Sequence, residues 1–280
     1  MRTIFKHLFL LSMFIAFVGA NKAQEIKVIT YNIRYNNPAD GENSWPNRKT
    51  SVESIFKQYQ ADIYCLQEVL HSQLIDLQTM LTDYSWVGVG RDDGKEAGEH
   101  SPIFYKTNKY QLINSGTFWL SPTPAIAGSK GWDAALPRIC TWAQLKDISN
   151  GKVFVVFNTH FDHQSKKARQ ESVRLILTTT RTLADSLPIL FAGDLNSEPN
   201  SRVYKMILCN KKYGFIDSYQ KQAGHCTFTS FNVNGSICKR LDFIFYNKHF
   251  SLTQYQIIKN QRGMYYPSDH LPVMAILHLQ

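Results

Sequence analysis

The sequence lacks the short patterns that mark several common classes of enzyme and metal protein. It has no G-x-S-x-G nucleophile elbow, no G-x-x-x-x-G-K-[ST] phosphate loop and no H-E-x-x-H helix, which excludes the serine-hydrolase, P-loop and zinc-protease templates. Its five cysteines include no C-x-x-C pair, so a structural zinc site has little support. No Pro/Ser-rich linker, charge block or low-complexity segment interrupts the chain, which favours a single domain.

The N-terminal segment differs from the rest of the chain and is typical of a secretory signal peptide. Two basic residues precede an apolar run at 8–18, which ends in Gly19-Ala20. This run is too short for a comfortable membrane span, which disfavours a retained anchor, and no cysteine follows it to carry a lipid. We therefore expect a signal peptide over 1–20, or with cleavage as late as residue 23. We also expect an exported protein, periplasmic or secreted, without a stable membrane anchor.

The remaining chain, residues 24–280, is long enough for one large α/β domain, which we expect to be monomeric. Its composition is globular, with ample aliphatic and aromatic residues for a sizeable core. The formal net charge is +9, or +7 once Arg2 and Lys6 leave with the signal peptide. Such a surface favours anionic partners without identifying them, and the scattering of the basic residues weakens a claim of tight nucleic-acid binding.

The cysteines fall into two groups. Cys65 and Cys140 lie in strand-like runs, where we expect them to be buried as small apolar side chains. Cys209, Cys226 and Cys238 lie nearer to loops. One disulfide among these three can form in an exported protein, and the sequence leaves its pairing open.

Strand-like and helix-like segments alternate along the chain in two loosely similar halves. Each half reads strand, helix, strand, and a polar signature stands where a strand ends. The middle of the chain is rich in short strand candidates, which argues against a purely parallel doubly wound sheet. We expect layered mixed sheets with outer helices and a site at the strand ends. The main expected strands are 25–33, 62–69, 152–161, 188–195, 241–246 and 271–279, and the main expected helices are 52–59 and 165–185.

Two polar residues at the ends of the first two strands are candidate metal ligands. Glu68 ends an apolar run, where a carboxylate is costly unless it is paired or bound to a metal. A hard cation held by oxygen ligands suits that position. Asn32 ends the preceding strand in a similar way, and it either adds a neutral oxygen or caps the backbone.

Two further pairs of polar residues suggest acid–base chemistry. Asp194 and Asn196 are separated by one residue, so in an extended chain they point the same way and can deprotonate and aim one water. The segment around them also suits a turn. Asp242 lies within a strand-like run and needs a partner if it is half-buried. His270, which follows Ser-Asp and precedes a new strand, can supply that partner.

The segment from Asn158 to His163 is the densest polar cluster, and it permits two interpretations. In the first, Asn158 and His160 reach over a phosphate. In the second, the segment follows the H-x-H-x-D-H zinc motif of the metallo-β-lactamase fold, but Asn158 occupies the first ligand position and a carboxamide is a poor zinc ligand. The phosphate interpretation is therefore favoured. Glu99, just before another strand, either orients His160 or lies exposed on the surface.

In order and spacing, these segments resemble the endonuclease/exonuclease/phosphatase superfamily, the fold shared by DNase I and related phosphoesterases. The resemblance covers residues 30–273 and is nearest to an exported bacterial branch, similar at a distance to the nocturnin-type deadenylases. It implies a four-layered α/β sandwich and a Mg²⁺- or Mn²⁺-dependent attack of water on phosphorus. The segments that carry it are Thr30-Tyr31-Asn32-Ile33-Arg34, Leu66-Gln67-Glu68, Asn158-Thr159-His160, Gly193-Asp194-Leu195-Asn196 and Ser268-Asp269-His270.

The resemblance implies a metal centre and a base. Glu68 is implied to hold the metal, with Asn32 and Asp269 near it, whether one ion or two are bound. Asp194 is implied to be the general base or the group that orients the attacking water, with Asn196 beside it. A cation and a positioned carboxylate together agree with the chemistry expected from the residues themselves.

The resemblance also implies groups that stabilise negative charge. His160 and His270 are implied to act as imidazolium donors to the phosphoryl oxygens. Asp242 is implied to orient His270 and to keep it protonated. Arg34, Glu99 and Asn158 are expected in supporting positions.

The superfamily does not fix the substrate. We expect a phosphodiesterase acting on nucleic acid or nucleotides, as an endonuclease or a 3'-5' exonuclease, with a phosphomonoesterase for sugar or inositol phosphates as the alternative. A catalytically silent binding protein is disfavoured because every catalytic position is filled. The distinctive loops, 36–47 and 123–137, carry or adjoin Trp45, Trp119 and Trp132, which either stack on a base or sugar or pack against the scaffold. No hydrophobic hairpin suggests membrane insertion.

Overall fold

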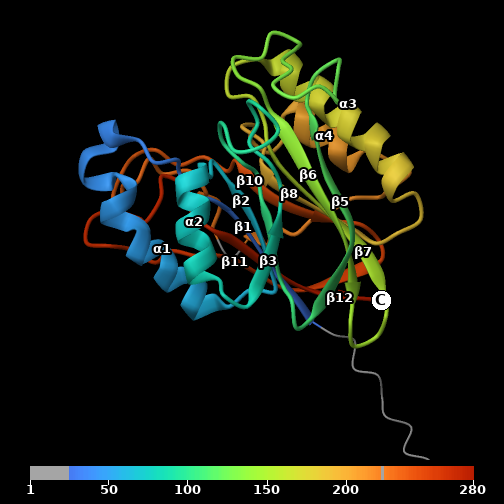
Figure 1. The fold of residues 1–280 in the computed structure, drawn as a ribbon, viewed down its shortest axis with the longest axis horizontal. Helices are drawn as coiled ribbons and strands as arrows, with labels where there is room; N and C mark the ends of the chain where they lie inside the picture. Colours follow the sequence, from blue (N-terminus) through green and yellow to red (C-terminus); the bar gives the residue numbers. More distant parts are fainter. Residues whose placement is uncertain (1–24, 222–223) are drawn as a thin grey trace, which may run out of the picture.

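The computed structural model describes residues 25–221 and 224–280, so the expected signal peptide lies outside the described residues. In the described part, two six-stranded sheets pack face to face, and helices cover the outer face of each sheet (Figure 1). The expected four-layered α/β sandwich is confirmed. None of the helices in these two ranges is long and apolar enough to cross a membrane.

Each sheet is mixed, and its parallel pair is joined through a covering helix. In the first sheet β1 and β2 are parallel, and in the second sheet β7 and β8 are parallel. The first sheet has the spatial order β11 (Phe250–Ile257), β12 (Val273–Leu279), β1 (Glu25–Asn32), β2 (Ile63–Gln67), β4 (Ile103–Lys106) and β3 (Tyr84–Val87). The second has the order β5 (Tyr110–Trp119), β6 (Ile139–Asp147), β7 (Val153–His160), β8 (Ile189–Asp194), β10 (Asp242–Tyr246) and β9 (Ile216–Asp217).

The helices form the two outer layers. The covering elements are α1 (Trp45–Tyr59) and α2 (His71–Met80) over the first sheet, and α3 (Lys166–Leu183) and α4 (Arg202–Leu208) over the second (Figure 1). A 3-10 turn, η1 (Pro38–Asn43), precedes α1, so the expected loop over 36–47 is wrong for most of its length. Pro46 lies in the first turn of α1, where its missing N–H leaves no hydrogen bond unmade.

Three apolar layers follow from the alternation of side chains along the strands. In β1, Ile26 and Val28 face the second sheet, whereas Ile29 and Tyr31 pack under α1 and α2. Strand β7 repeats the pattern towards the first sheet on one face and towards α3 and α4 on the other. The core between the sheets is therefore formed by every second residue of the central strands.

The inward-facing columns of side chains end in polar residues at one end of the sandwich. Asn32 ends the inward column of β1, His160 that of β7 and Asp194 that of β8, and all three are buried. In the sheet register, Asp194 lies opposite His160 on one side and opposite Asp242 on the other. The strand alternation that builds the core thus also brings the polar strand ends together.

Two of the three tryptophans that the sequence placed in or beside loops pack against the scaffold. Trp45 is buried, and its indole N–H donates to Asp76. Trp119 is also buried at the end of β5, and its indole N–H donates to the carbonyl of Arg91. The packing alternative is confirmed for both, which leaves only Trp132 of the three for contact with a ligand.

Candidate active site

A cavity of about 700 Å³ opens at the end of the sandwich where the polar strand ends meet. Both sheets contribute to its lining, because Glu68 and Asp269 come from the first sheet and His160 and Asp194 from the second. The cavity thus lies across the seam between the two sheets. With the exception of Asn32, Asn158 and Asp242, every site residue expected from the sequence lines it.

Asp242 and His270 form the expected pair. Nδ1 of His270 lies 2.8 Å from Oδ2 of Asp242, and both side chains are buried. Burial opposes the charging of His270, but the carboxylates of Asp242 and Asp194 raise its pKa well above the ordinary value. His270 is therefore an imidazolium whose Nε2 faces Asp194 at 3.6 Å.

Asp194 lies at the centre of the polar cluster. Its Oδ2 accepts a hydrogen bond from Nδ2 of Asn32 at 3.1 Å, and its Oδ1 accepts one from the backbone N–H of Asn196 at 2.8 Å. Burial, with the charge of Asp242, raises the pKa of Asp194 to about 7. Gly193 permits this placement, because a Cβ there would lie 2.0 Å from the carbonyl oxygen of Thr159 in β7.

Glu68 and Asp269 are the carboxylates that fit a divalent cation. Both line the cavity, and burial together with the charge of Glu68 raises the pKa of Asp269. Two carboxylates that repel each other in a buried site are stabilised by a hard cation, and oxygen donors suit Mg²⁺ or Mn²⁺. The residues present therefore fit the expected metal.

Asn32 differs from the expectation that it offers an oxygen to the metal. Its amide nitrogen donates to Glu68 at 3.0 Å and also to Asp194, while its Oδ1 accepts from the backbone N–H of Arg34. Asn32 therefore holds two carboxylates in position. Arg34 makes two hydrogen bonds to Asp40 and lies 3.8 Å from Glu68, in the supporting position expected for it.

His160 is held as a neutral imidazole, contrary to the expectation of an imidazolium. Burial and the charges of Arg138 and Arg91 lower its pKa well below the ordinary value. Its Nε2 lies 3.0 Å from Nδ2 of Asn196 and 3.4 Å from Oδ2 of Asp194. Its Nδ1 faces Glu99 at 3.8 Å. Glu99 is half-buried and lines the cavity, so the surface-exposed alternative is wrong.

Asn158 does not reach the cavity, and the prediction that it lies over a phosphate is wrong. The side chain is fully buried between the sheets. Its Nδ2 donates to the carbonyls of Leu66 and Pro102, and its Oδ1 accepts from Gln67 at 2.7 Å. Asn158 therefore joins β7 to the end of β2 and to the residue that precedes β4, both in the interior of the first sheet.

Sequence reasoning missed the basic residues of the cavity wall. Arg91, Arg138 and His163 all line the cavity. Residues 91–94 form a turn, and the Arg91 side chain points inward from it, where it pairs with Glu99 at 2.7 Å. Arg138 immediately precedes β6, so a charged residue at the start of an apolar run was a signal that could have identified it.

Arg48 was also missed, although it supports the site from behind. It is fully buried in α1, and desolvation lowers its pKa to about 10. Its side chain donates to the backbone carbonyls of Ile33, Arg34, Asn43 and Pro267. Arg34 lies beside Glu68, and Pro267 lies two residues before Asp269. No sequence pattern marks a surface-like arginine in a helix as a buried donor of this kind.

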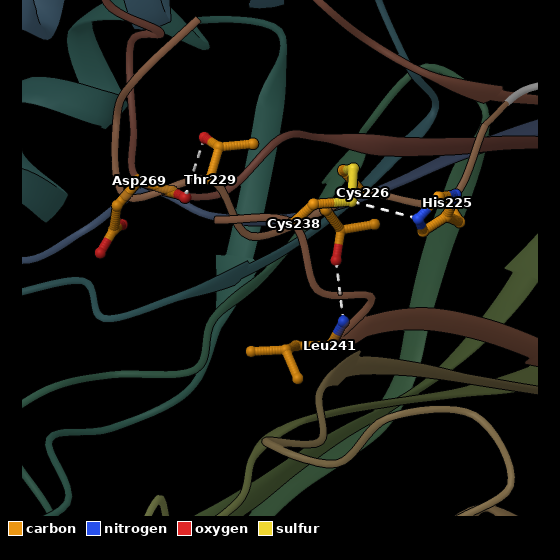
Figure 2. Close-up of a disulfide and its surroundings, with 7 residues drawn as sticks. His225, Cys226, Thr229, Cys238, Leu241 and Asp269 are labelled. Carbon is orange, nitrogen blue, oxygen red and sulfur yellow. Dashed lines mark hydrogen bonds between the residues drawn. A yellow bond between two sulfur atoms is a disulfide. The ribbon is translucent and has the colours of Figure 1, made fainter. Parts of the chain in front are cut away.

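A disulfide closes the loop of residues 226–238, which precedes β10 (Figure 2). It joins Cys226 to Cys238, whereas Cys209 is free and exposed. The adjacent Thr227 accepts hydrogen bonds through Oγ1 from the backbone N–H groups of Leu241 and Asp242. The disulfide therefore lies one residue from a contact that positions the start of β10.

The same loop also contacts His270 and Asp269. The ring of Phe228 lies 4.9 Å from that of His270, centroid to centroid. Thr229 donates through its backbone N–H and its hydroxyl to the carbonyl of Asp269 (Figure 2). The loop thus contacts both His270 and the backbone of the neighbouring Asp269.

Comparison with known proteins finds relatives that cover most of the chain. The pattern of the Endonuclease/Exonuclease/phosphatase family matches residues 29–270. The endonuclease/exonuclease/phosphatase structure from Bacteroides vulgatus is 38% identical, with a TM-score of 0.84 over 92% of this chain and 100% of that one. A mannosyl-6-phosphatase from Bacteroides thetaiotaomicron is 36% identical, with a TM-score of 0.83 over 90% of this chain and 99% of that one.

The curated relatives are more distant. Nocturnin of Drosophila melanogaster is 26% identical over 84% of this chain and 42% of its own length, so the expected similarity to nocturnins is confirmed. The chain spans about half the length of the curated relatives it matches.

Proposed function

The chain belongs to the endonuclease/exonuclease/phosphatase family, and on that premise we propose that it is a divalent-metal-dependent hydrolase of phosphate esters. The observation that carries the proposal is the His270–Asp242 pair beside the buried Asp194, in a cavity that also holds two carboxylates suited to a cation. An acid, a base and a cation site around one cavity are the groups that phosphoester hydrolysis requires.

The acidic wall of the cavity supplies the metal site and the base. Glu68 and Asp269 would hold Mg²⁺ or Mn²⁺, which neutralises charge on a phosphoryl oxygen when bound. Asp194 accepts the proton of the attacking water, because its pKa of about 7 places a carboxylate base near neutral pH. Asn32 and Asn196 keep its two oxygens oriented.

The imidazolium of His270 stabilises negative charge on the substrate. Its Nε2–H is available to a phosphoryl oxygen, while Nδ1–H remains bound to Asp242. Because Asp242 is buried, this orientation does not depend on the substrate. His160, as a neutral ring, contributes hydrogen bonding rather than a positive charge.

Two substrate classes are candidates. The resemblance to nocturnin-type deadenylases favours a phosphodiester in nucleic acid or a nucleotide. The mannosyl-6-phosphatase favours a sugar phosphomonoester, and it is the more similar protein in both identity and coverage. We therefore favour a phosphomonoester as the substrate class to be tested first.

We also propose that the protein acts outside the cytoplasm and as a monomer. The Cys226–Cys238 disulfide supports an oxidising compartment. Expression of the full sequence in a bacterial host, followed by cell fractionation and N-terminal sequencing, tests export. A protein that starts at Met1 in the cytoplasmic fraction contradicts it, and light scattering of the purified protein tests the monomer.

A substrate panel with matched controls tests the catalytic proposal. The panel comprises p-nitrophenyl phosphate, bis(p-nitrophenyl) phosphate, mannose 6-phosphate and a DNA and an RNA oligonucleotide. We expect hydrolysis with Mg²⁺ or Mn²⁺, loss with EDTA, and a loss of about 10²-fold or more in Asp194→Asn. Asp185→Asn, at an exposed carboxylate, is the control and should match the wild type. Activity that survives both EDTA and Asp194→Asn contradicts the mechanism.

A further inference from the structure

Arg138 is a buried cation whose hydrogen-bonding capacity is largely unused. Its side chain is 5% exposed and lines the cavity. Within the described residues, neither Nε nor Nη1 has a hydrogen-bond partner. The remaining nitrogen, Nη2, lies 3.1 Å from Nδ1 of His163. Burial of a guanidinium whose N–H groups lack acceptors costs free energy, so an anion in the cavity would stabilise Arg138.

The carboxylates near Arg138 are already committed elsewhere. Glu99 pairs with Arg91 at 2.7 Å. Asp162 lies 3.9 Å from Nε of Arg138, beyond hydrogen-bonding distance, and accepts instead from the backbone N–H groups of Ala135, Gln164 and Ser165. Arg138 is therefore not required to hold the turn after β7, and its free donors are left for a ligand.

The cavity wall around Arg138 carries other unpaired nitrogens. Nε of Arg91 and Nδ1 of His160 are also buried without a hydrogen-bond partner among the described residues. Burial lowers the pKa of Arg138, while the charges of Glu99 and Glu68, which also line the cavity, act in the opposite direction. The cavity thus has an acidic wall suited to a cation and a basic wall suited to an anion, within reach of one another.

A terminal phosphate matches these two walls better than a diester does. It has three non-bridging oxygens and about two negative charges, whereas a diester has two such oxygens and one charge. If the cation and His270 bind two oxygens, the third faces the basic wall. In a diester that position is an ester oxygen with a carbon substituent, which leaves the guanidinium unpaired in a buried site.

We propose that Arg138, supported by Arg91, binds the third non-bridging oxygen of a terminal phosphate and so makes the enzyme selective for phosphomonoesters. This inference rests on the proposed phosphoester hydrolysis and names its substrate class. Arg138 is a specificity-determining residue in this account, and Glu99 is a positioning residue that keeps Arg91 beside it.

Steady-state kinetics on a matched pair of substrates tests the inference. We expect the wild-type enzyme to favour p-nitrophenyl phosphate over bis(p-nitrophenyl) phosphate by at least about tenfold in kcat/KM. Arg138→Gln should lower kcat/KM for the monoester by about 10- to 100-fold and change that for the diester less than about threefold. Inorganic phosphate should inhibit this variant more weakly by a similar factor. Arg138→Lys should retain part of the preference, because it keeps the charge but not the planar fork.

The controls separate a folding defect from a loss of recognition. Arg174→Gln removes an arginine that is exposed on α3 and pairs with Glu171, and it should leave both substrates unaffected. If Arg138→Gln does not fold, Arg138→Lys and the phosphate inhibition of the wild type still test the inference. Equal losses on both substrates, or a wild-type preference for the diester, overturn it while the hydrolase proposal stands. If the wild type hydrolyses neither substrate and no member of the panel, the proposed function itself fails.

Discussion

Nδ1 of His270 and Oδ2 of Asp242 lie 2.8 Å apart, and neither side chain has more than slight contact with solvent. The two residues come from different sheets, since Asp242 begins β10 and His270 precedes β12. Their hydrogen bond therefore fixes both the orientation of the imidazole and its proton. The two side chains act as one unit.

Asp242→Asn should lower kcat/KM by about 10²-fold without unfolding the protein. The amide cannot stabilise the imidazolium, so His270 loses the charge that it presents to the phosphoryl oxygen. His270→Gln should have a similar effect, and the double variant should be no worse than either single variant, because the residues act together. Additive losses in the double-mutant cycle would show that the two side chains work independently.

Metal binding should be visible as stabilisation of the folded protein. A cation at a concentration of about 100 times its Kd stabilises the folded state by about 2.7 kcal/mol, which raises Tm by roughly 5–10 °C in a domain of this size. We expect Mn²⁺ and Mg²⁺ to raise Tm of the wild type, and EDTA to reverse the shift. Glu68→Gln should remove most of it, whereas Glu53→Gln, at a surface carboxylate of α1, should keep it. If the cation raises Tm of Glu68→Gln as much as that of the wild type, the metal binds elsewhere.

Asn158→Ala should affect stability rather than substrate binding. The substitution leaves Gln67 and the carbonyls of Leu66 and Pro102 without their buried partner, which costs about 2–4 kcal/mol of the free energy of unfolding. Urea unfolding measures this loss, with the exposed Asn234→Ala as the control. KM of the folded variant should change less than about twofold. A large rise in KM with unchanged stability would restore the phosphate-contacting role.

Asn158 also shows why part of the site could be predicted from the sequence and part could not. The alternation of apolar and polar residues indicated which strands end in functional groups, and Asp194, Asp242 and His270 meet as expected. Asn158 lies on the same face of β7 as His160 but two residues earlier, about 7 Å deeper. Depth relative to the opposite sheet depends on how the sheets pack, which no local pattern records.

The basic residues illustrate a second limit. Arg91 lies in a turn, and a turn sequence does not say whether its side chain points outward or inward. Arg48 resembles any solvent-facing residue of an amphipathic helix, yet it is fully buried. The orientation of Arg48 depends on contacts that include one distant in sequence, the hydrogen bond to the carbonyl of Pro267. That of Arg91 depends on the pairing with Glu99 across the same loop.

Arg48→Met should destabilise the protein by about 3 kcal/mol, because several buried carbonyl groups lose their donor while the aliphatic volume is kept. Those carbonyls belong to the segments next to Glu68 and Asp269, so the affinity for Mn²⁺ should also fall. Urea unfolding and metal titration measure the two effects, with Lys49→Met, at a half-exposed neighbour, as the control. A loss of stability with unchanged metal affinity would confine Arg48 to the scaffold.

Removal of the disulfide should weaken both the fold and the dyad. Cys226→Ser combined with Cys238→Ser should reduce the free energy of unfolding by about 3 kcal/mol, as expected for a loop of this length. Activity should fall several-fold, because the loop positions the backbone of Asp242. Dithiothreitol should reproduce both effects in the wild type. It should also do so in Cys209→Ser, because Cys209 is free and takes no part in the disulfide. Unchanged kinetics after reduction would show that the hydrogen bonds of Thr227 hold the loop alone.

The position of β12 has a consequence for the time at which activity appears during biosynthesis. This strand, residues 273–279, lies between β11 and β1 in the interior of the first sheet, although β1 is made more than 240 residues earlier. Asp269 and His270 immediately precede it. A ribosome-bound chain with all of the second sheet already translated therefore still lacks Asp269 and His270, and under the proposed function we expect no hydrolysis of phosphate esters before β12 has been synthesised.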